Sequence, residues 1–200
     1  MKFLTYTENL EQLEKAKSAE ISEVIISEES FGRYTRTKGQ ELLTQLLHKA
    51  KDLGLKTIFE WDIIIVESDF DKACEEFKQI DLSLIDIIRV QDVGVLDYVL
   101  EYTDKKIQFI CESGNHNLLG LKAWRDHIGA RLDRLVLSIE LNKDKLTEYK
   151  KELGCELEVL VLGKILLFYS PRKLLSALDI SLEAKDHLSG LADSEESPHK

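Results

Sequence analysis

Amphipathic stretches alternate with β-branched apolar runs along most of the chain. Three of the amphipathic stretches end at a glycine, Gly54, Gly129 or Gly154, and an apolar run follows each of them. Glycine is favoured at the left-handed position that closes a helix. The runs that follow have the composition of buried parallel strands. The pattern therefore predicts a repeated unit of one helix followed by one strand.

The same pattern, followed from end to end, predicts helices and strands in regular alternation. The helices are expected at residues 8–16, 40–53, 70–79, 94–102, 118–128 and 143–153. The strands are expected at residues 2–5, 23–27, 56–60, 85–90, 107–111, 134–139 and 156–162. Asn142 is expected to cap the last helix. Alternation of this kind implies a parallel sheet with the helices outside it.

The number and spacing of the strands favour a barrel. We expect an α/β fold, a TIM-like (β/α) barrel that is incomplete, because about seven parallel strands are one short of eight. Residues 164–169 are a candidate for a last strand, which would run antiparallel after a turn at Gly163. No glycine-rich phosphate motif follows the first strand, which disfavours nucleotide-binding open sheets. Residues 1–180 are expected to form the barrel domain and residues 181–200 a polar tail.

Composition and charge narrow the class of protein. The 200 residues are 44% hydrophobic, which suits one domain with a buried core. The net charge is −10, and a field of this sign disfavours nonspecific binding to nucleic acid or to an anionic membrane. The N-terminus does not resemble a signal peptide, and no apolar run is long enough for a membrane helix. We therefore expect a soluble cytoplasmic protein.

The number and spacing of the cysteines indicate neither disulfide bonds nor a metal site. The chain has three, Cys74, Cys111 and Cys155, and none of them lie in a CxxC spacing. An odd number without this spacing disfavours a disulfide framework and a structural zinc site. The three are interpreted as free thiols, with burial as their main role.

The carboxyl ends of the predicted strands are the natural place for a site, because barrel enzymes hold their catalytic residues there. A carboxylate pair at this edge can position a water or a metal, and the acidic residues at or near it include Asp62 and Glu112. The catalytic candidates are Asp92, Arg134 and Glu140, which are expected to converge on one mouth of the barrel. The alternative is that they pair with neighbours and hold loops in place, since polar residues gather at strand ends in any case.

Further residues are candidates for binding. The substrate-binding candidates are Glu60, Asn117, Tyr169 and Arg172. Arg172, next to Lys173, has the charge to hold an anionic ligand, whereas a solvated loop explains the same residues. His116 is the one histidine placed to act, but it has no fixed partner in the sequence. No GxSxG motif surrounds a serine, so a serine hydrolase is not indicated.

Residues 156–176 resemble a family signature. Glu158, Gly163, Tyr169, Ser170 and Ser176 stand in register with the signature of the collagenase-like peptidases, peptidase family U, number thirty-two. Residues 85–96 and 111–141 resemble further blocks of the same family, and residues 31–37 resemble its loop after the second strand more weakly. The two cysteine positions of the signature hold Leu166 and Lys173 here.

The resemblance implies both a fold and several activities. It implies a TIM-type barrel. Some members of the family are described as collagenase-like proteases, and others hydroxylate RNA or quinone precursors with an iron–sulfur cluster on four cysteines, so the resemblance implies either activity for this chain. Because Leu166 and Lys173 cannot act as thiolate ligands, we expect no cluster, no metal and no other cofactor.

Three functions remain open. The first is a cluster-free enzyme of the peptidase family that acts on a peptide or another small substrate at the barrel mouth. The second is a non-catalytic partner or binding subunit that pairs with a complete family member, or with a second copy to cover an open sheet edge. The third is hydroxylation, which requires the cluster. The missing cysteines favour the second function more than the family name suggests.

Overall fold

The fold is built on a parallel sheet whose strands pair in sequence order. The computed structural model describes residues 2–35, 37–112 and 117–163. The seven strands make six parallel pairings, each between neighbours in sequence, so that β1 and β7 are the two edges of the described sheet. The strands are β1 (Leu4–Tyr6), β2 (Glu23–Ile26), β3 (Lys56–Trp61), β4 (Ile87–Val90), β5 (Lys106–Cys111), β6 (Leu132–Leu137) and β7 (Glu156–Val159).

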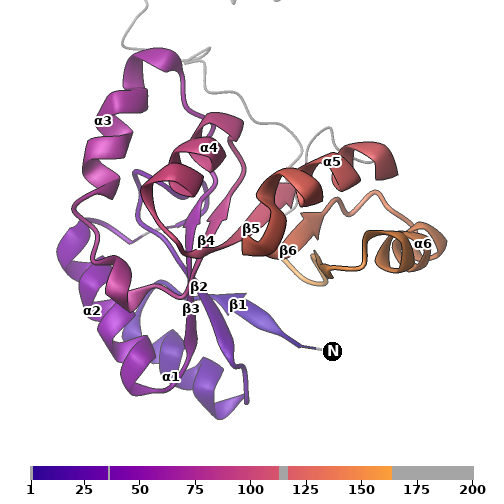
Figure 1. The fold of residues 1–200 in the computed structure, drawn as a ribbon. Helices are drawn as coiled ribbons and strands as arrows, with labels where there is room; N and C mark the ends of the chain where they lie inside the picture. Colours follow the sequence, from indigo (N-terminus) through magenta and orange to yellow (C-terminus); the bar gives the residue numbers. More distant parts are fainter. Residues whose placement is uncertain (1, 36, 113–116, 164–200) are drawn as a thin grey trace, which may run out of the picture. The chain divides into compact units, whose positions relative to one another are not determined.

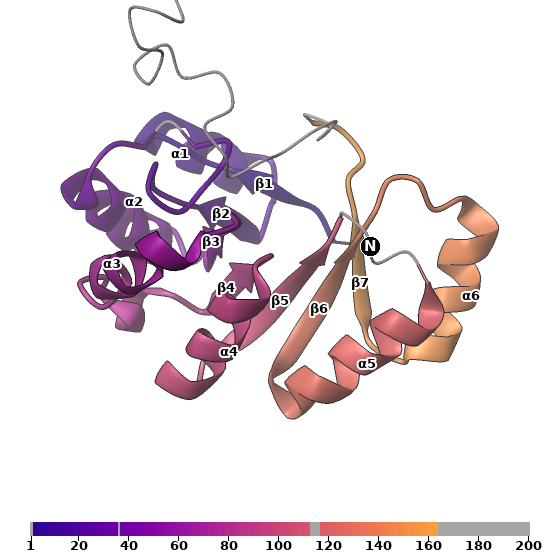
Figure 2. The same ribbon diagram turned by 90° about the horizontal axis from the view of Figure 1, so that it is seen from above.

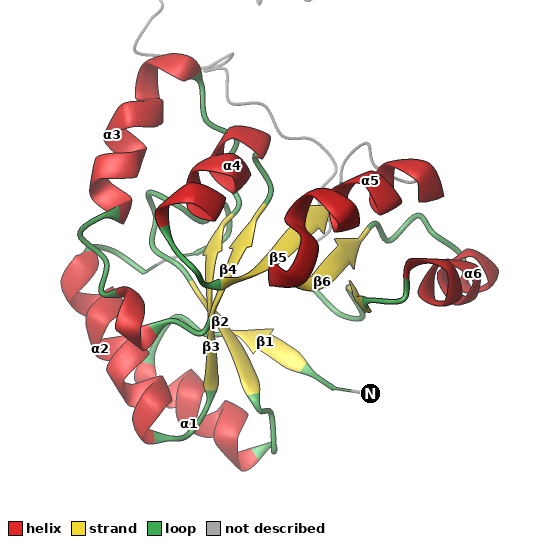
Figure 3. Cartoon of the chain, in the orientation of Figure 1, coloured by secondary structure: helices red, strands yellow, loops and turns green. Residues whose placement is uncertain are grey.

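Helices connect the strands and cover one face of the sheet (Figure 1, Figure 3). They are α1 (Leu10–Ser18), α2 (Gln40–Asp52), α3 (Glu67–Phe77), α4 (Val93–Tyr102), α5 (Leu118–Ile128) and α6 (Lys143–Leu153). Two short 3₁₀ turns, Leu82–Leu84 and Gly129–Arg131, precede β4 and β6. Figure 2 shows the sheet curling with the helices on its outer side. The predicted fold class is therefore confirmed: the described chain is an incomplete TIM-like α/β barrel.

Local signals explain where several elements begin and end. The helices at Leu118–Ile128 and Lys143–Leu153 have the predicted bounds. Asn142 caps α6 as expected, because its side chain accepts a hydrogen bond from the backbone N–H of Lys145 at 2.9 Å. Gly154 closes α6 in the left-handed region, with φ 63° and ψ 15°.

Other bounds differ from the prediction. The first strand is Leu4–Tyr6 and not 2–5, and the sixth begins at Leu132, two residues earlier than expected. The last strand ends at Val159, where its pairing with Leu137 ends, so the apolar run beyond it does not extend the ladder. The two 3₁₀ turns were not predicted. The candidate strand at 164–169, the tail at 181–200 and the domain boundary at 180 lie outside the described residues.

The main apolar core lies between the outer face of the sheet and the helices. An aromatic cluster forms its centre, in which the ring of Phe31 meets those of Phe59 and Trp61 edge-on at 5.3 and 5.0 Å. Phe77 of α3 is fully buried and its ring lies 5.0 Å from that of Trp61. The cluster attaches α3 and the loop after β2 to β3, and it continues to Tyr98 of α4.

The inner face of the curled sheet is partly charged. A small apolar cluster of Ile25, Ile58 and Ile87 occupies one part of it. Beside this cluster, Arg89 of β4 donates two hydrogen bonds to Glu158 of β7, at 2.6 and 2.8 Å, and a third to Gln108 of β5 at 2.8 Å. Strands β4 and β7 are three positions apart in the sheet, so this contact runs across its concave side.

A second arginine makes a similar contact. Arg134 of β6 donates to Glu23 of β2, four strands away, and to its neighbour Asp133 at 2.9 Å. Tyr6 of β1 donates to Glu60 of β3 at 2.8 Å. Through these pairs every strand contributes a polar side chain to the inner face. The inner network is defined here as Tyr6, Glu23, Glu60, Arg89, Gln108, Asp133, Arg134 and Glu158.

None of the described helices combines the length and the apolar character that crossing a membrane would need.

The aromatic cluster yields a test of the outer core. We expect Phe77→Ala to lower the free energy of unfolding by about 3–5 kcal/mol, because a large ring at the centre of the cluster leaves a cavity. Phe70→Ala is the control, since Phe70 is only half-buried and touches the cluster at its margin, through Tyr98. Urea denaturation measures both variants. Equal losses in the two would contradict the central place of Phe77.

Candidate functional site

The candidate site lies at the carboxyl edge of the sheet, called the mouth below. The loop after β2 brings Arg33 into it. Phe31 anchors this loop in the aromatic cluster, and its carbonyl accepts hydrogen bonds from the backbone N–H groups of Asp62 and Ile63. At Gly32 a Cβ atom would lie 2.5 Å from the Ser27 hydroxyl, so only glycine allows this close approach. The loop is thereby held across the end of β3.

Arg33 joins two carboxylates of the mouth. Its backbone N–H and its Nε both donate to Asp62, each at 2.7 Å, and one of its terminal nitrogens lies 3.3 Å from Glu112. The side chain is only 5% exposed. Burial alone would lower the pKa of Arg33, but the two carboxylates outweigh it and raise the pKa. The guanidinium stays charged and fixes both acids.

Glu60 lies two residues before Asp62 and faces the same side of β3. It is 1% exposed, and its nearest cation, Arg89, stands 3.8 Å away and is bound mainly to Glu158. Burial first, and then the charge of Asp62, raise the pKa of Glu60 to about 8. At neutral pH most of this carboxyl is therefore protonated. Tyr6 is 45% exposed as a whole, but its hydroxyl reaches inward to Glu60, and burial of that end raises the pKa of Tyr6.

The chemistry available here is limited by access. The mouth cluster is defined as Tyr6, Arg33, Glu60, Asp62 and Glu112. A neutral carboxyl such as that of Glu60 can donate or accept a proton, but its burial keeps it from a substrate in the described arrangement. Within residues 2–35, 37–112 and 117–163, no three histidine, cysteine or acidic side chains are grouped to hold a metal.

The described cysteines do not offer a nucleophile. Burial raises the pKa of Cys111 to about 12, so its sulfur is a neutral thiol at neutral pH. Burial also raises the pKa of Cys74 and of Cys155. The three are free thiols, as the sequence suggested.

The structure does not gather the three catalytic candidates at one place. Asp92 and Glu140 follow the carboxyl ends of β4 and β6, on the mouth side of the sheet. Arg134 is the third residue of β6 and binds Glu23, the first residue of β2, so it points to the inner face away from the mouth. The expected convergence is wrong for Arg134, because its charge is buried against acids of the inner network. A catalytic role for each residue stays a prediction.

Helix capping accounts for two of the candidates. The Asp92 carboxylate accepts a hydrogen bond from Val95 at the start of α4 and another from the backbone of Ile65. Asn117 caps α5 by accepting from Gly120 at 2.8 Å. Among the binding candidates, Glu60 faces the inner side of the mouth. Tyr169, Arg172 and His116 lie outside the described residues.

Exposed apolar side chains surround the mouth. Among the described residues eleven large hydrophobic side chains are exposed, and nine of them stand at the carboxyl end of a strand or at the start of the helix that follows. Leu119, Val161 and Leu162 are 80%, 78% and 94% exposed. These nine residues are called the rim: Tyr6, Leu10, Val66, Val93, Leu119, Ile139, Val159, Val161 and Leu162.

Comparison with family models identifies the chain. The model described as peptidase family U32 matches residues 8–186, which is most of the sequence. The chain belongs to peptidase family U32. The resemblance in its signature region is thereby confirmed, and the match also covers the weaker N-terminal part. A comparison with proteins of curated function gave no match.

Solved structures share the fold at low identity. A 3-dehydroquinate dehydratase from Aquifex aeolicus is 12% identical, with a TM-score of 0.57 over 80% of this chain and 78% of that one. A phospho-2-dehydro-3-deoxyheptonate aldolase from Thermotoga maritima is 14% identical, with a TM-score of 0.50 over 80% of this chain and 51% of that one. At this level of identity the likeness shows the fold alone, and the chain spans about half the length of the second protein.

The buried acid of this U32 protein gives a prediction for stability against pH. The pKa of Glu60 is about 8 in the folded chain and about 4.3 in an unfolded one. The folded state therefore binds the extra proton between these values, and the free energy of unfolding falls as pH rises through this window, by at most about 1.4 kcal/mol per unit.

Glu60→Gln should remove this fall in the free energy of unfolding with rising pH, because glutamine stays neutral and still accepts a hydrogen bond from Tyr6. Urea denaturation from pH 5 to pH 8 is the measurement. We expect the variant to match the wild type near pH 5 and to exceed its stability at pH 8. Asp62→Asn is the matched control and should destabilise at every pH in this range, since it breaks the bonds to Arg33. Parallel pH profiles for wild type and Glu60→Gln would contradict the buried neutral acid.

Proposed function

We propose that this U32 family protein is a cluster-free binding subunit, which acts through the mouth of its half-barrel and does not itself cleave peptides. The partner we propose is another protein, in the first place a complete relative of the same family. One observation carries the proposal. Arg33, Glu60 and Asp62 of the mouth cluster are buried against one another, whereas the apolar side chains of the rim are exposed.

Burial of the charges argues against hydrolysis. A general base must come within about 3 Å of the proton that it removes. Glu60 and Asp62 are both almost fully buried, and both carboxylate oxygens of Asp62 accept hydrogen bonds from Arg33. Freeing it would leave a buried charge unpaired, at a cost of about 3–5 kcal/mol. Exposed apolar groups around the mouth support protein binding, since contiguous patches of this kind mark interaction sites.

A peptidase or other hydrolase is the second candidate, and one observation favours it. The pKa of Glu60 is raised to about 8 in the immediate neighbourhood of the Asp62 carboxylate. Pairs of acids in which one is kept neutral supply the proton donor in many hydrolytic sites. This function requires a movement of the loop around Arg33 that would open Glu60 to a substrate.

An assay of peptide hydrolysis separates the two functions. We expect purified full-length protein to release no fragments from labelled gelatin or casein beyond the level of its Glu60→Gln variant. The exposed substitution Glu101→Gln is the control for contaminating peptidases, because it leaves the mouth untouched. Hydrolysis that persists in Glu101→Gln and is lost in Glu60→Gln would overturn the binding function and support the hydrolase.

Hydroxylation is addressed by an iron measurement. Leu166 and Lys173 occupy the cysteine positions of the family signature, and both lie outside the described residues. We expect protein purified without oxygen to contain no stoichiometric iron and no visible charge-transfer band, since leucine and lysine do not ligate such clusters. Stoichiometric iron with that band would revive the third function.

A further inference from the structure

We infer that the rim of the mouth is a docking surface for a protein segment that presents apolar and basic residues on one face. The inference deepens the proposed function and rests on it, because it names the chemistry of the partner that the binding subunit would hold. Two independent features of the described residues support it: the position of the exposed apolar side chains and the excess of acids over bases in the first turns of the helices.

The apolar side chains are concentrated on one edge. Single exposed hydrophobic residues are ordinary on a protein surface, and a random distribution would place them at both edges. Of the eleven exposed large hydrophobic side chains among the described residues, only Phe3 and Tyr102 lie away from the mouth. The ring of Tyr102 is stacked on that of Tyr98. Each strand except β2 has a rim residue at its end or in the connection that follows it. The apolar groups therefore ring the mouth and are not scattered.

The first turns of the helices carry more acids than bases, whereas the last turns carry both signs. The helices run antiparallel to the strands, so their first turns lie on the mouth side of the sheet, and of the described helices only α3 also ends near the mouth, where Phe77 packs on Phe31. The acids of the first turns are Glu11, Glu41, Glu67, Asp69 and Asp144. The last turns hold the bases Lys15, Lys17, Lys49, Lys51, Arg125, His127, Lys150 and Lys151 together with the acids Asp52, Glu75, Glu76, Glu101, Asp126 and Glu152.

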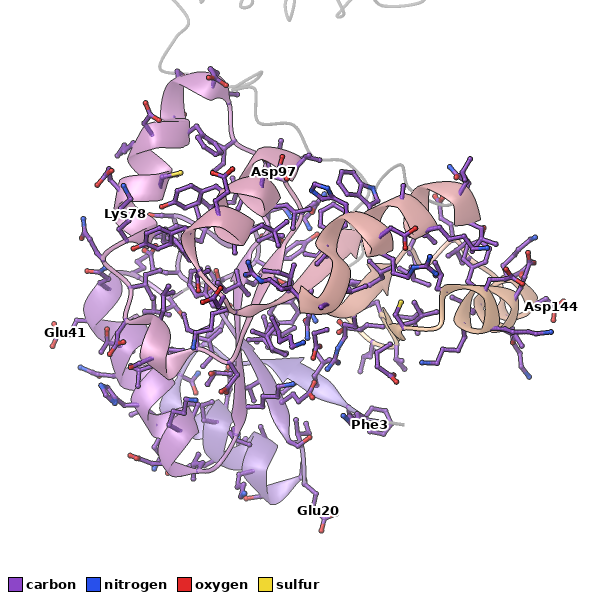
Figure 4. All side chains as sticks on the ribbon, in the orientation of Figure 1. Phe3, Glu20, Glu41, Lys78, Asp97 and Asp144 are labelled. Carbon is purple, nitrogen blue, oxygen red and sulfur yellow. The ribbon has the colours of Figure 1, made fainter. Side chains whose placement is uncertain are left out.

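Helix dipoles explain why α1, α2, α3 and α6 begin with acids, since a negative charge stabilises a helix start. The sum over several helices gives the mouth an acidic border. Glu41 and Asp144 point away from the sheet into solvent, where a partner can reach them (Figure 4). Lys143 and Lys145, in the first turn of α6, are exceptions to the acidic pattern.

Together the two features select the partner. An apolar rim inside an acidic border matches a segment with leucine-like residues flanked by lysine or arginine, and it repels an acidic one. The same border disfavours nucleic acid. The chain's own opposite edge carries both signs of charge and few exposed apolar residues, so a second copy does not present the matching surface.

Peptide binding tests the inference. A short labelled helix-forming peptide of leucine and lysine is titrated with full-length protein, and fluorescence anisotropy reports the affinity. A peptide of the same pattern with glutamate in place of lysine is the charge control. We expect the basic peptide to bind, and the acidic peptide to bind at least tenfold more weakly. Added salt should weaken the binding of the basic peptide, because salt screens the exposed charges of the border.

Matched variants locate the binding. Leu119→Ser and Val161→Ser should each lower the affinity for the basic peptide about tenfold, because each removes an apolar contact of the rim. Phe3→Ser removes an equally exposed apolar residue at the other edge and should change the affinity less than twofold. Glu67→Lys should also weaken binding, whereas Glu101→Lys on α4, outside the helix's first turn, should not.

Four results would overturn the inference. The first three are no binding of the basic peptide, equal affinity for the acidic and the basic peptide, and a loss of affinity in Phe3→Ser as large as that in Leu119→Ser. The fourth is self-association of the free protein that Leu119→Ser abolishes, since a second copy would then be the occupant. Failure of the proposed function is seen separately, as peptide hydrolysis that Glu60→Gln removes. A protein that hydrolyses nothing and ignores the basic peptide loses only this inference.

Discussion

Two buried arginines on the inner face of the sheet set the constraint on which the rest depends. A charge out of water is tolerated only when it is paired and hydrogen-bonded. The partners of Arg89 and Arg134 include Glu158 and Glu23, which lie three and four strands away. In a flat sheet these strands would be roughly 14–19 Å apart, so the pairs form only when the sheet curls. The inner network thus couples charge neutralisation to the shape of the half-barrel.

The same network shapes the mouth. Arg89 is bound mainly to Glu158 and stands 3.8 Å from Glu60, so its charge offsets only part of the burial and of the Asp62 charge that raise the pKa of Glu60. Asp62 in turn is fixed by Arg33 from the loop after β2. The mouth is therefore a closed polar centre within an apolar border. Such a surface suits binding of a protein segment better than turnover of a substrate, which is the physical ground for the proposed function.

Local signals let the sequence predict the fold well. Asn142 and Gly154 flank a helix that has its predicted bounds, because a cap and a left-handed glycine act within one turn. The strand-end acids Glu60 and Asp62 were also recognised. Arg33 was missed, because its partner lies 29 residues away and no local pattern marks it. Arg134 was misplaced for the same reason, since its pairing with Glu23 spans 111 residues and depends on a curl that no local pattern encodes.

The most direct test is a double-mutant cycle on Arg89 and Glu158, measured as free energy of unfolding. We predict that Arg89→Met and Glu158→Gln each cost about 3–5 kcal/mol, because each leaves a buried partner uncompensated. The double variant should cost less than the sum of the two, with a coupling of about 0.5–3 kcal/mol. Additive losses, or single variants as stable as the wild type, would contradict the claim that charge pairing across the inner face holds the sheet in its curled form.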